Sequence, residues 1–315
     1  MFLEILLFAT FLLTAFSVIG NDVIQTLGTY ISSNKGTHWG FQFLYIGSIL
    51  VITVLTGWHL NAGDVTYGRA TELLMSPERM GWWIILPPIT LLVLTRFGIP
   101  ISTTFLILAT FSPQLLIGKM MVKSLLGYVI AFGFSFLFYL WASKKIKGIR
   151  NKNARIWMVL QWITTGVLWA TWLMQDLVNM FIYYPNPISF ERLLTLLAVS
   201  LIIVAYILRA KGGRIQEVVD KKSSTHNLAS ATVIDMTYAL ILVLFTYVNN
   251  VPMSTTWVFI GLLGGRELGM AISLRSTKTK QARKLITKDL MKVAIGMAVS
   301  LIITALMTYF FVSQE

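Results

Sequence analysis

The sequence predicts an all-α integral membrane protein built from two repeats of inverted topology, each with a re-entrant or broken helical hairpin. Three observations support this prediction: an apolar composition, long apolar segments separated by short basic ones, and motifs that occur once in each half. Of the 315 residues, 56% are hydrophobic and only 12% are charged, about half the charged share of an ordinary soluble domain. The mean hydropathy is +0.73. Disorder, collagen-like structure and a soluble enzyme therefore do not fit.

Ten apolar segments approach the roughly 20 residues that a membrane-crossing helix needs. They are residues 2–20, 40–60, 82–95, 101–117, 124–142, 156–182, 192–208, 229–247, 257–274 and 293–311. We divide the chain into an N-terminal membrane repeat (1–142), a basic cytoplasmic linker (143–155) and a C-terminal membrane repeat (156–315). The first segment carries Glu4 where a signal peptide has basic residues, so we expect it to remain as a membrane helix.

Most of the 26 Lys and Arg residues fall into three clusters, within residues 144–155, 209–222 and 275–292. Because basic loops stay in the cytoplasm, we expect all three clusters inside and both termini outside the cell membrane. Each half has five segments, an odd number, so the halves face opposite ways. This topology explains the net charge of +13 without a nucleic-acid partner, although anionic lipid is a further possible contact.

Two motifs recur at matched spacing. Asn21-Asp-Val-Ile-Gln25 resembles Gln175-Asp-Leu-Val-Asn179, and Pro100-Ile-Ser-Thr-Thr104 resembles Pro252-Met-Ser-Thr-Thr256. From the Asp to the Ser of the second motif the distance is 80 residues in the first half and 78 in the second. Chance does not readily produce two such matches, so the sequence predicts an internal repeat.

The two prolines predict helix breaks inside apolar sequence. Pro100 and Pro252 cannot sit within a helix without interrupting it, and Ser102 and Ser254 are placed to cap the helix that follows. Each Ser-Thr-Thr is therefore expected at the tip of a hairpin part-way through the bilayer. Broken helices in matching positions of two halves are typical of the substrate site of a secondary transporter.

These motifs predict a site for an anion together with cations. A carboxylate within a membrane helix costs about 2.5–3.5 kcal/mol on insertion scales, so Asp22 and Asp176 are expected to have a function, although either alone could simply sit at a wetted helix end. Hydroxyls and free N–H groups at a helix start favour an oxyanion of phosphate size; a simple capping role is the alternative. The predicted phosphate ligands are Asp22, Gln25, Ser102, Thr103, Thr104, Asp176, Asn179, Ser254, Thr255 and Thr256.

Two carboxylates beside an anion repel it and each other by several kcal/mol in a low dielectric. Cations must therefore bind with the anion, or the carboxylates must be protonated. Carboxylate and amide oxygens suit Na⁺, and the predicted Na⁺ ligands are Asn21, Asp22, Gln175 and Asp176. We favour phosphate over sulfate because phosphate keeps a proton near neutral pH and can donate it to an Asp. The expected function is symport of phosphate with Na⁺ or H⁺ by alternating access.

The motifs resemble those of the inorganic phosphate transporter (PiT) family of sodium- or proton-coupled carriers, whose signatures are Gly-Ala-Asn-Asp-Val-Ala-Asn and Gly-Leu-Pro-Val-Ser-Thr-Thr-His. The resemblance extends to the flanks and covers most of the chain. It implies a homodimer with phosphate held between the Asp motifs and the hairpin tips. This sequence departs from the pattern at Gln25 and Gln175, which replace Asn, and at Phe105 and Trp257, which replace His.

Other functions fit less well. His38, His59 and His226 are scattered, and cysteine is absent, so we expect no resident metal or thiol chemistry. No hydrolase or nucleotide-binding motif is present, and we expect neither catalytic residues nor an enzyme. The alternatives that stay open are a permease of the same fold for sulfate or another oxyanion, and a membrane receptor that does not transport.

Overall fold

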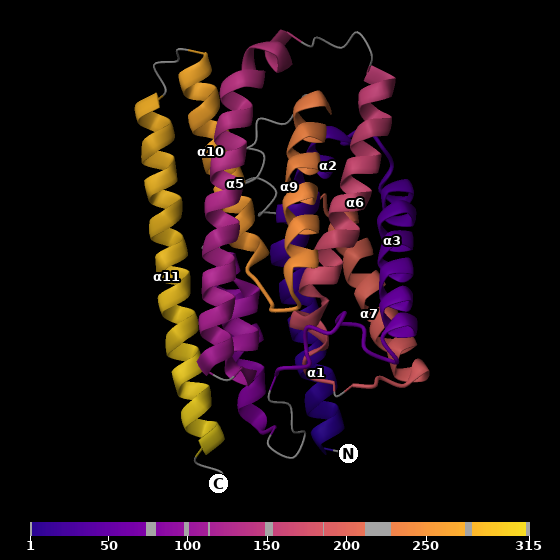
Figure 1. Ribbon diagram of the computed structural model, residues 1–315. Coiled ribbons are helices and arrows are strands. Elements are labelled where there is room, and N and C mark those ends of the chain that lie inside the picture. The colour runs from indigo at the N-terminus through magenta and orange to yellow at the C-terminus, as the bar shows by residue number, and fades with distance from the viewer. Residues whose placement is uncertain are drawn as a thin grey trace.

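The computed structural model of the chain describes residues 2–73, 80–97, 101–112, 114–148, 154–184, 186–211, 228–274 and 279–312. Within these ranges the chain is helical and contains no strand. Long helices lie roughly side by side in one elongated bundle (Figure 1). The prediction of an all-α protein is confirmed.

The first half forms five α-helices, with short π- and 3₁₀-helices between them. Their bounds are α1 Phe2–Val18, η1 Ile19–Val23, α2 Ile24–Ser33, α3 Trp39–Leu60, η3 Trp82–Ile85, α4 Leu86–Arg96, η4 Thr104–Leu108, η5 Ala109–Phe111 and α5 Gln114–Gly148. The π-helix η1 connects α1 to α2 without a loop, so the first acidic motif interrupts a helix instead of following one.

Within the described ranges, the second half forms five α-helices. Their bounds are α6 Ala154–Phe181, α7 Phe190–Arg209, α9 Leu228–Val248, α10 Thr255–Ser273 and α11 Thr279–Val312. Residues 149–153 and 212–227 lie outside the described ranges, and so do Pro100 and parts of all three basic clusters. The expected linker is largely helical where it is described, because α5 continues to Gly148 and α6 begins at Ala154.

Seven helical stretches in the described ranges are long and apolar enough to cross a membrane. They are Phe2–Val23, Trp39–Leu60, Leu115–Lys144, Ala154–Phe181, Phe190–Arg209, Leu228–Val248 and Ala282–Met307. The expectation of ten was therefore too high. The apolar helix Trp82–Arg96 is short, and α10 carries the charged pair Arg266 and Glu267 within its 19 residues.

The expected segments 101–117 and 124–142 also have different boundaries in the structure. The helical segment ends at Ser112, whose backbone is extended (φ −108°, ψ 135°). The helix α5 then runs without interruption for 35 residues. Pro113 follows Ser112 in the sequence, and a residue before proline disfavours helix. A hydropathy average cannot detect such a break because both sides of it are apolar.

The long helices α5 and α10 pack against each other, as Figure 1 also shows. A Cβ added at Gly261 would lie 2.5 Å from the backbone oxygen of Tyr128, and one at Gly269 would lie 2.6 Å from that of Phe136. Gly265 meets the backbone oxygen of Phe132 in the same way. Small residues four apart thus allow the two backbones to approach closely, as in many membrane helix pairs.

Apolar and polar side chains are distributed as in a membrane protein. Large apolar side chains are exposed on the outer faces of the helices, for example Phe41 at 68%, Leu137 at 64% and Ile302 at 59%. Polar and acidic side chains, Asp22 and Asp176 among them, are buried instead. A large apolar exterior marks a surface that contacts something other than water. Together with the seven apolar helices, this arrangement identifies a multi-pass membrane protein.

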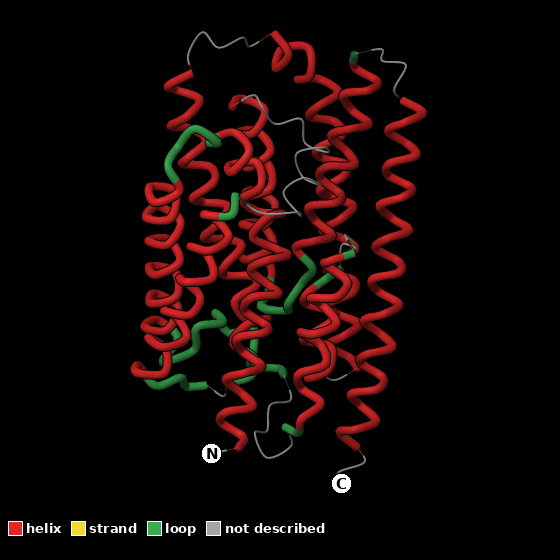
Figure 2. The backbone as a smooth tube through the Cα atoms, turned by 180° about the vertical axis from the view of Figure 1, so that it is seen from behind, coloured by secondary structure: helices red, strands yellow, loops and turns green. Residues whose placement is uncertain are grey.

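The two described ends of the chain lie at the same end of the bundle (Figures 1 and 2). The end of α5, the start of α6, the end of α10 and the start of α11 lie at the opposite end (Figure 1). Lys144 near the end of α5 and Lys280 near the start of α11 therefore share that opposite end. The described parts of these two basic clusters are thus on one side of the molecule.

Candidate functional site

The first acidic motif lies in the π-helix between α1 and α2. Asp22 is 1% exposed, and its Oδ1 accepts a hydrogen bond from Nδ2 of Asn21 at 2.8 Å. Nε2 of Gln25 lies 3.5 Å from the same oxygen. π-turns inserted in α-helices are frequent at functional sites, because the extra residue turns a side chain out of the regular helical register.

The second acidic motif lies within α6 and is completely buried. Oδ1 of Asp176 accepts from Nδ2 of Asn179 at 2.8 Å. Oδ2 of Asp176 and Oδ1 of Asn179 have no hydrogen-bond partner among the described residues. The hydroxyls of Thr104 and Thr255 lie beside Asp176 without bonding to Oδ2. Two buried acceptor oxygens thus lack a donor, which is the arrangement a bound cation satisfies.

Thr103 joins the two acidic motifs. Its Oγ1 donates to Oδ2 of Asp22 at 2.8 Å and accepts from Nδ2 of Asn179 at 3.2 Å. One hydroxyl from the first hairpin tip therefore links a carboxylate of the first half to an amide of the second. Asp22 and Asp176 lie on the two sides of this link, so the structure brings together motifs that are far apart in the sequence.

The two hairpin tips also contact each other, and they do so reciprocally. Oγ1 of Thr104 donates to the backbone oxygen of Met253 at 3.0 Å, and Oγ1 of Thr256 donates to the backbone oxygen of Ile101 at 3.4 Å. Thr104 and Thr256 are the last residues of the two Ser-Thr-Thr motifs, and Ile101 and Met253 are the residues before them. Equivalent positions thus make equivalent contacts across the site.

The serines cap the segments that follow them, as expected. Oγ of Ser254 accepts from the backbone N–H of Trp257 at 3.3 Å, at the start of α10. Oγ of Ser102 accepts from the N–H of Phe105 at 3.2 Å. Each serine hydroxyl thereby satisfies an N–H group that has no partner within its helix. Both serines are buried, next to the threonines that approach the carboxylates.

Gln175 makes different contacts from those expected of a Na⁺ ligand. Its Nε2 donates to Oγ1 of Thr246 at 2.7 Å and approaches the backbone oxygen of Leu242 at 3.4 Å. Its Oε1 accepts from Nε of Arg69 at 3.2 Å. The side chain is therefore shared between α9 and the segment after α3. The other predicted ligands lie together in the core, and only Gln25 among them is partly exposed.

Two buried charged residues were absent from the predicted set, Asp235 within the helix core and Arg69 beside Gln175. Asp235 on α9 is fully buried and accepts from the hydroxyls of Thr29 on α2 and Thr165 on α6, the latter at 2.6 Å. Asp235 could have been identified from the sequence as a buried polar residue, because it lies in the middle of an apolar segment. Arg69 gave no such signal, because it lies between two apolar segments, where charged residues are common.

The arrangement is suited to holding a small anion with cations. Thr103, Thr104 and Thr255 offer hydroxyls, and α10 begins at the site with its positive dipole end. The carboxylates of Asp22 and Asp176 offer oxygen ligands for a hard cation. No cluster of three or more His, Cys, Asp or Glu that could hold a metal ion exists in the described ranges, but Na⁺ also accepts hydroxyl and amide oxygens. The residues therefore fit a Na⁺ site.

Comparison with known proteins links this geometry to a fold. No protein-family model matches the sequence, and no curated protein matches it. A solved structure described as "The sodium-dependent phosphate transporter" superposes with a TM-score of 0.64 at 14% identity, covering 100% of this chain and 99% of that chain. The chain thus has the fold of that transporter over its whole length. This fold is the one that the two pairs of motifs implied.

Proposed function

We propose that the protein is a secondary active transporter that moves inorganic phosphate together with a cation, Na⁺, by alternating access. The observation that carries the proposal is the bridge from Asp22 through Thr103 to Asn179, which unites both acidic motifs with a hairpin tip in a buried site. The shared fold with a sodium-dependent phosphate transporter supports it independently.

The charges of the site determine the coupling. Asp22 and Asp176 are both buried, and unscreened like charges at close range in a low dielectric repel strongly. An oxyanion adds further negative charge, so it enters with cations that bind the carboxylate oxygens. Oδ2 of Asp176 and Oδ1 of Asn179, which lack donors, are the oxygens that a cation would contact. Cation and anion therefore bind together, and neither binds well alone.

Neutral hydroxyl donors would contribute to holding phosphate. The hydroxyls of Thr103, Thr104 and Thr255 lie beside the carboxylates, and reorienting these hydroxyls toward an oxyanion needs no change of backbone. A protonated phosphate can also donate to Asp22 or Asp176, which sulfate cannot do near neutral pH. This difference favours phosphate as the substrate.

Alternating access would occur about the hairpin tips. The site residues apart from Gln25 are buried in this conformation, and the tips are joined by the hydroxyl contacts of Thr104 and Thr256. Separating the tips toward one side or the other would expose the site to that side. Discontinuous helices at the interface of two halves are the elements that move in many secondary transporters.

The proposed orientation places both termini outside the cell and the basic connections in the cytoplasm. Lys144 and Lys280 lie at the end of the bundle opposite the termini. Arg209 at the end of α7 stacks over the ring of Trp39, with its guanidinium carbon 6.0 Å from the ring centre. An aromatic ring beside a basic residue is typical of a membrane interface.

Uptake of radiolabelled phosphate into liposomes that contain the purified full chain tests the proposal. We expect uptake driven by an inward Na⁺ gradient and little uptake when K⁺ replaces Na⁺. Asp22→Asn and Asp176→Asn should each abolish uptake while the protein remains folded. Arg283→Gln, a change of charge at an exposed position on α11, is the matched control and should leave uptake unchanged.

The same assay separates the alternatives. Strong inhibition by a tenfold excess of sulfate would indicate an oxyanion permease of broader or different specificity. Cation-dependent flux that persists at full rate in both Asp variants would contradict the roles given to these residues. A folded protein with no flux of phosphate or sulfate would favour a receptor without transport activity.

A further inference from the structure

Arg69 is a charged residue that the structure buries in the protein. It lies in residues 61–73, after α3, and is only 2% exposed. Its Nε donates to Oε1 of Gln175 at 3.2 Å, and Nη1 lies 3.5 Å from the backbone oxygen of Tyr67. Nη2 is buried and has no hydrogen-bond partner among the described residues. A buried guanidinium N–H without an acceptor is unfavourable, so an acceptor beyond the described residues is expected.

A rigid turn directs Arg69 inward. The carboxylate of Asp64 accepts from the N–H of Gly68 at 2.8 Å and from Nδ2 of Asn186 at 2.9 Å. Tyr67 and Gly68 have positive φ angles of 56° and 75°, a conformation that a residue such as Tyr adopts only when its surroundings impose it. The position of Arg69 therefore follows from a constrained backbone and not from the freedom of its side chain.

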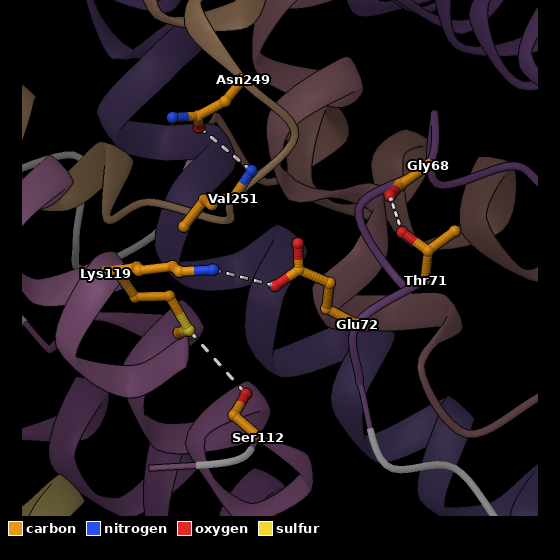
Figure 3. A network of polar contacts seen from close by, with 8 residues as sticks. Gly68, Thr71, Glu72, Ser112, Lys119, Asn249 and Val251 are labelled. Atoms are coloured by element: carbon orange, nitrogen blue, oxygen red, sulfur yellow. Dashed lines mark hydrogen bonds and ion pairs between the residues drawn. The ribbon is translucent and has the colours of Figure 1, made fainter. Parts of the chain in front are cut away.

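The same segment also contacts α5. Glu72 pairs with Lys119 on α5, with Nζ and Oε2 3.6 Å apart, and Oγ1 of Thr71 donates to the backbone oxygen of Gly68 at 2.7 Å (Figure 3). The segment thus reaches from Gln175 on α6 to α5. Arg69 itself contacts α6 through Gln175, next to Asp176 of the second acidic motif.

The charge of Arg69 is directed at the second acidic motif. Burial lowers the pKa of Arg69 to about 10, while Asp176 and then Asp64 raise it, so the guanidinium is protonated at neutral pH. Asp64 is occupied by its own turn. No described carboxylate forms an ion pair with Arg69. Gln175, which accepts its Nε–H, immediately precedes Asp176 in the chain.

We propose that Arg69 is a ligand of the transported oxyanion, a cation built into the chain that lowers the number of free cations the loaded site needs. This inference rests on the proposed function. An oxygen of the oxyanion accepts from Nη2, and the guanidinium charge offsets that of Asp176. Guanidinium groups form strong, charge-assisted hydrogen bonds with phosphate oxygens. The departure from Asn to Gln at position 175 then has a reason, because the longer side chain reaches the guanidinium.

Phosphate binding to the purified full chain, titrated at several Na⁺ concentrations, tests this proposal. For Arg69→Gln we expect the Kd for phosphate to rise at least tenfold and the dependence on Na⁺ to steepen by about one ion for each phosphate. Arg69→Lys keeps the charge and should keep the wild-type Na⁺ dependence, with a weaker loss of affinity. Arg283→Gln, the same change at an exposed position on α11, is the matched control and should stay within twofold of wild type.

Each other result contradicts a defined part of the argument. If Arg69→Gln lowers the melting temperature but leaves phosphate affinity and Na⁺ dependence as in wild type, Arg69 has only a structural role and the proposal is overturned. If Arg69→Gln does not fold, Arg69→Lys decides, and wild-type affinity in that variant overturns the proposal. A wild-type protein that binds no oxyanion would instead refute the proposed function itself, whatever the variants do.

Discussion

Oγ1 of Thr103 lies 2.8 Å from Oδ2 of Asp22, although the two residues are 81 positions apart in the sequence. The same hydroxyl accepts from Asn179, so three segments meet at a single atom. Both halves of the proposed site depend on this atom, because no other hydroxyl in the described residues bonds to groups of both acidic motifs.

Replacement of Thr103 by valine should therefore disable the site with little change in shape. Valine leaves Oδ2 of Asp22 and Nδ2 of Asn179 without this partner, at a cost of about 1–3 kcal/mol for each buried group. We expect Na⁺-driven phosphate uptake to fall at least tenfold in Thr103→Val. Thr103→Ser keeps the hydroxyl and should retain most of the uptake. Equal uptake by the two variants would show that the hydroxyl of Thr103 has no role in uptake.

Asp235 should stabilise the contact of α9 with α2 and α6. It accepts from Thr29 and Thr165, so Asp235→Ala leaves two buried hydroxyls without an acceptor and should reduce stability by about 1–3 kcal/mol. Thermal unfolding of the purified variants in detergent measures this effect.

A triple variant provides the control for Asp235. This variant combines Asp235→Ala with Thr29→Val and Thr165→Val, so both donors are removed together with the acceptor. Part of the lost stability should return, because the stability changes of residues in contact do not add. If the triple variant is less stable than Asp235→Ala, the hydroxyls contribute independently of the carboxylate.

The packing of α5 against α10 predicts opposite effects of one substitution at adjacent positions. Gly265→Ala places a Cβ against the backbone oxygen of Phe132, whereas a Cβ at Gly264 lies at an ordinary 3.5 Å from the Phe132 ring. We expect Gly265→Ala to destabilise the protein by about 1–3 kcal/mol through overpacking. Gly264→Ala should be neutral or stabilising, because alanine favours helix over glycine. Similar melting temperatures for both variants would contradict the close approach of the helices.

The proposed topology can be tested directly because the sequence contains no cysteine. Single cysteines at Lys144 and Thr71, which are both exposed, lie on the linker side and the terminus side of the bundle. A membrane-impermeant maleimide added to intact cells should label Thr71→Cys and not Lys144→Cys. Permeabilised cells should show labelling of both. The reverse pattern would invert the proposed orientation.

The fold class and the association of the motifs could be predicted from the sequence. Composition and apolar segments require helices in a membrane, because only helices or closed barrels satisfy the backbone there. The capping roles of Ser102 and Ser254 followed from local sequence alone. Repetition of Asp22 and Asp176 at matched spacing was enough to expect them near each other, since related halves place equivalent residues equivalently.

Other features depend on tertiary contacts that no local pattern encodes. The number of spanning helices was overestimated because the apolar pattern revealed neither the shortness of Trp82–Arg96 nor the end of the helix at Ser112, and because α10 carries a charged pair. The contact of Gln175 with α9 depends on how α6 and α9 are rotated, and the burial of Arg69 depends on the turn around Asp64. Gly269 was not expected to pack against α5, because its role appears only when the partner backbone is in place.

Two equivalent hydrogen bonds, from Thr104 to Met253 and from Thr256 to Ile101, join the hairpin tips. Both are bonds of a neutral hydroxyl to a backbone carbonyl, so each contributes only about 0.5–1.5 kcal/mol. These two hydrogen bonds therefore favour neither face of the membrane. The tips can separate toward either face at a small cost in free energy. A preference of the unloaded protein for one membrane face must arise from the helical arms that carry the tips. These arms are short in the first half of the chain (Leu86–Arg96 and Thr104–Phe111) and long in the second half (Leu228–Val248 and Thr255–Ser273).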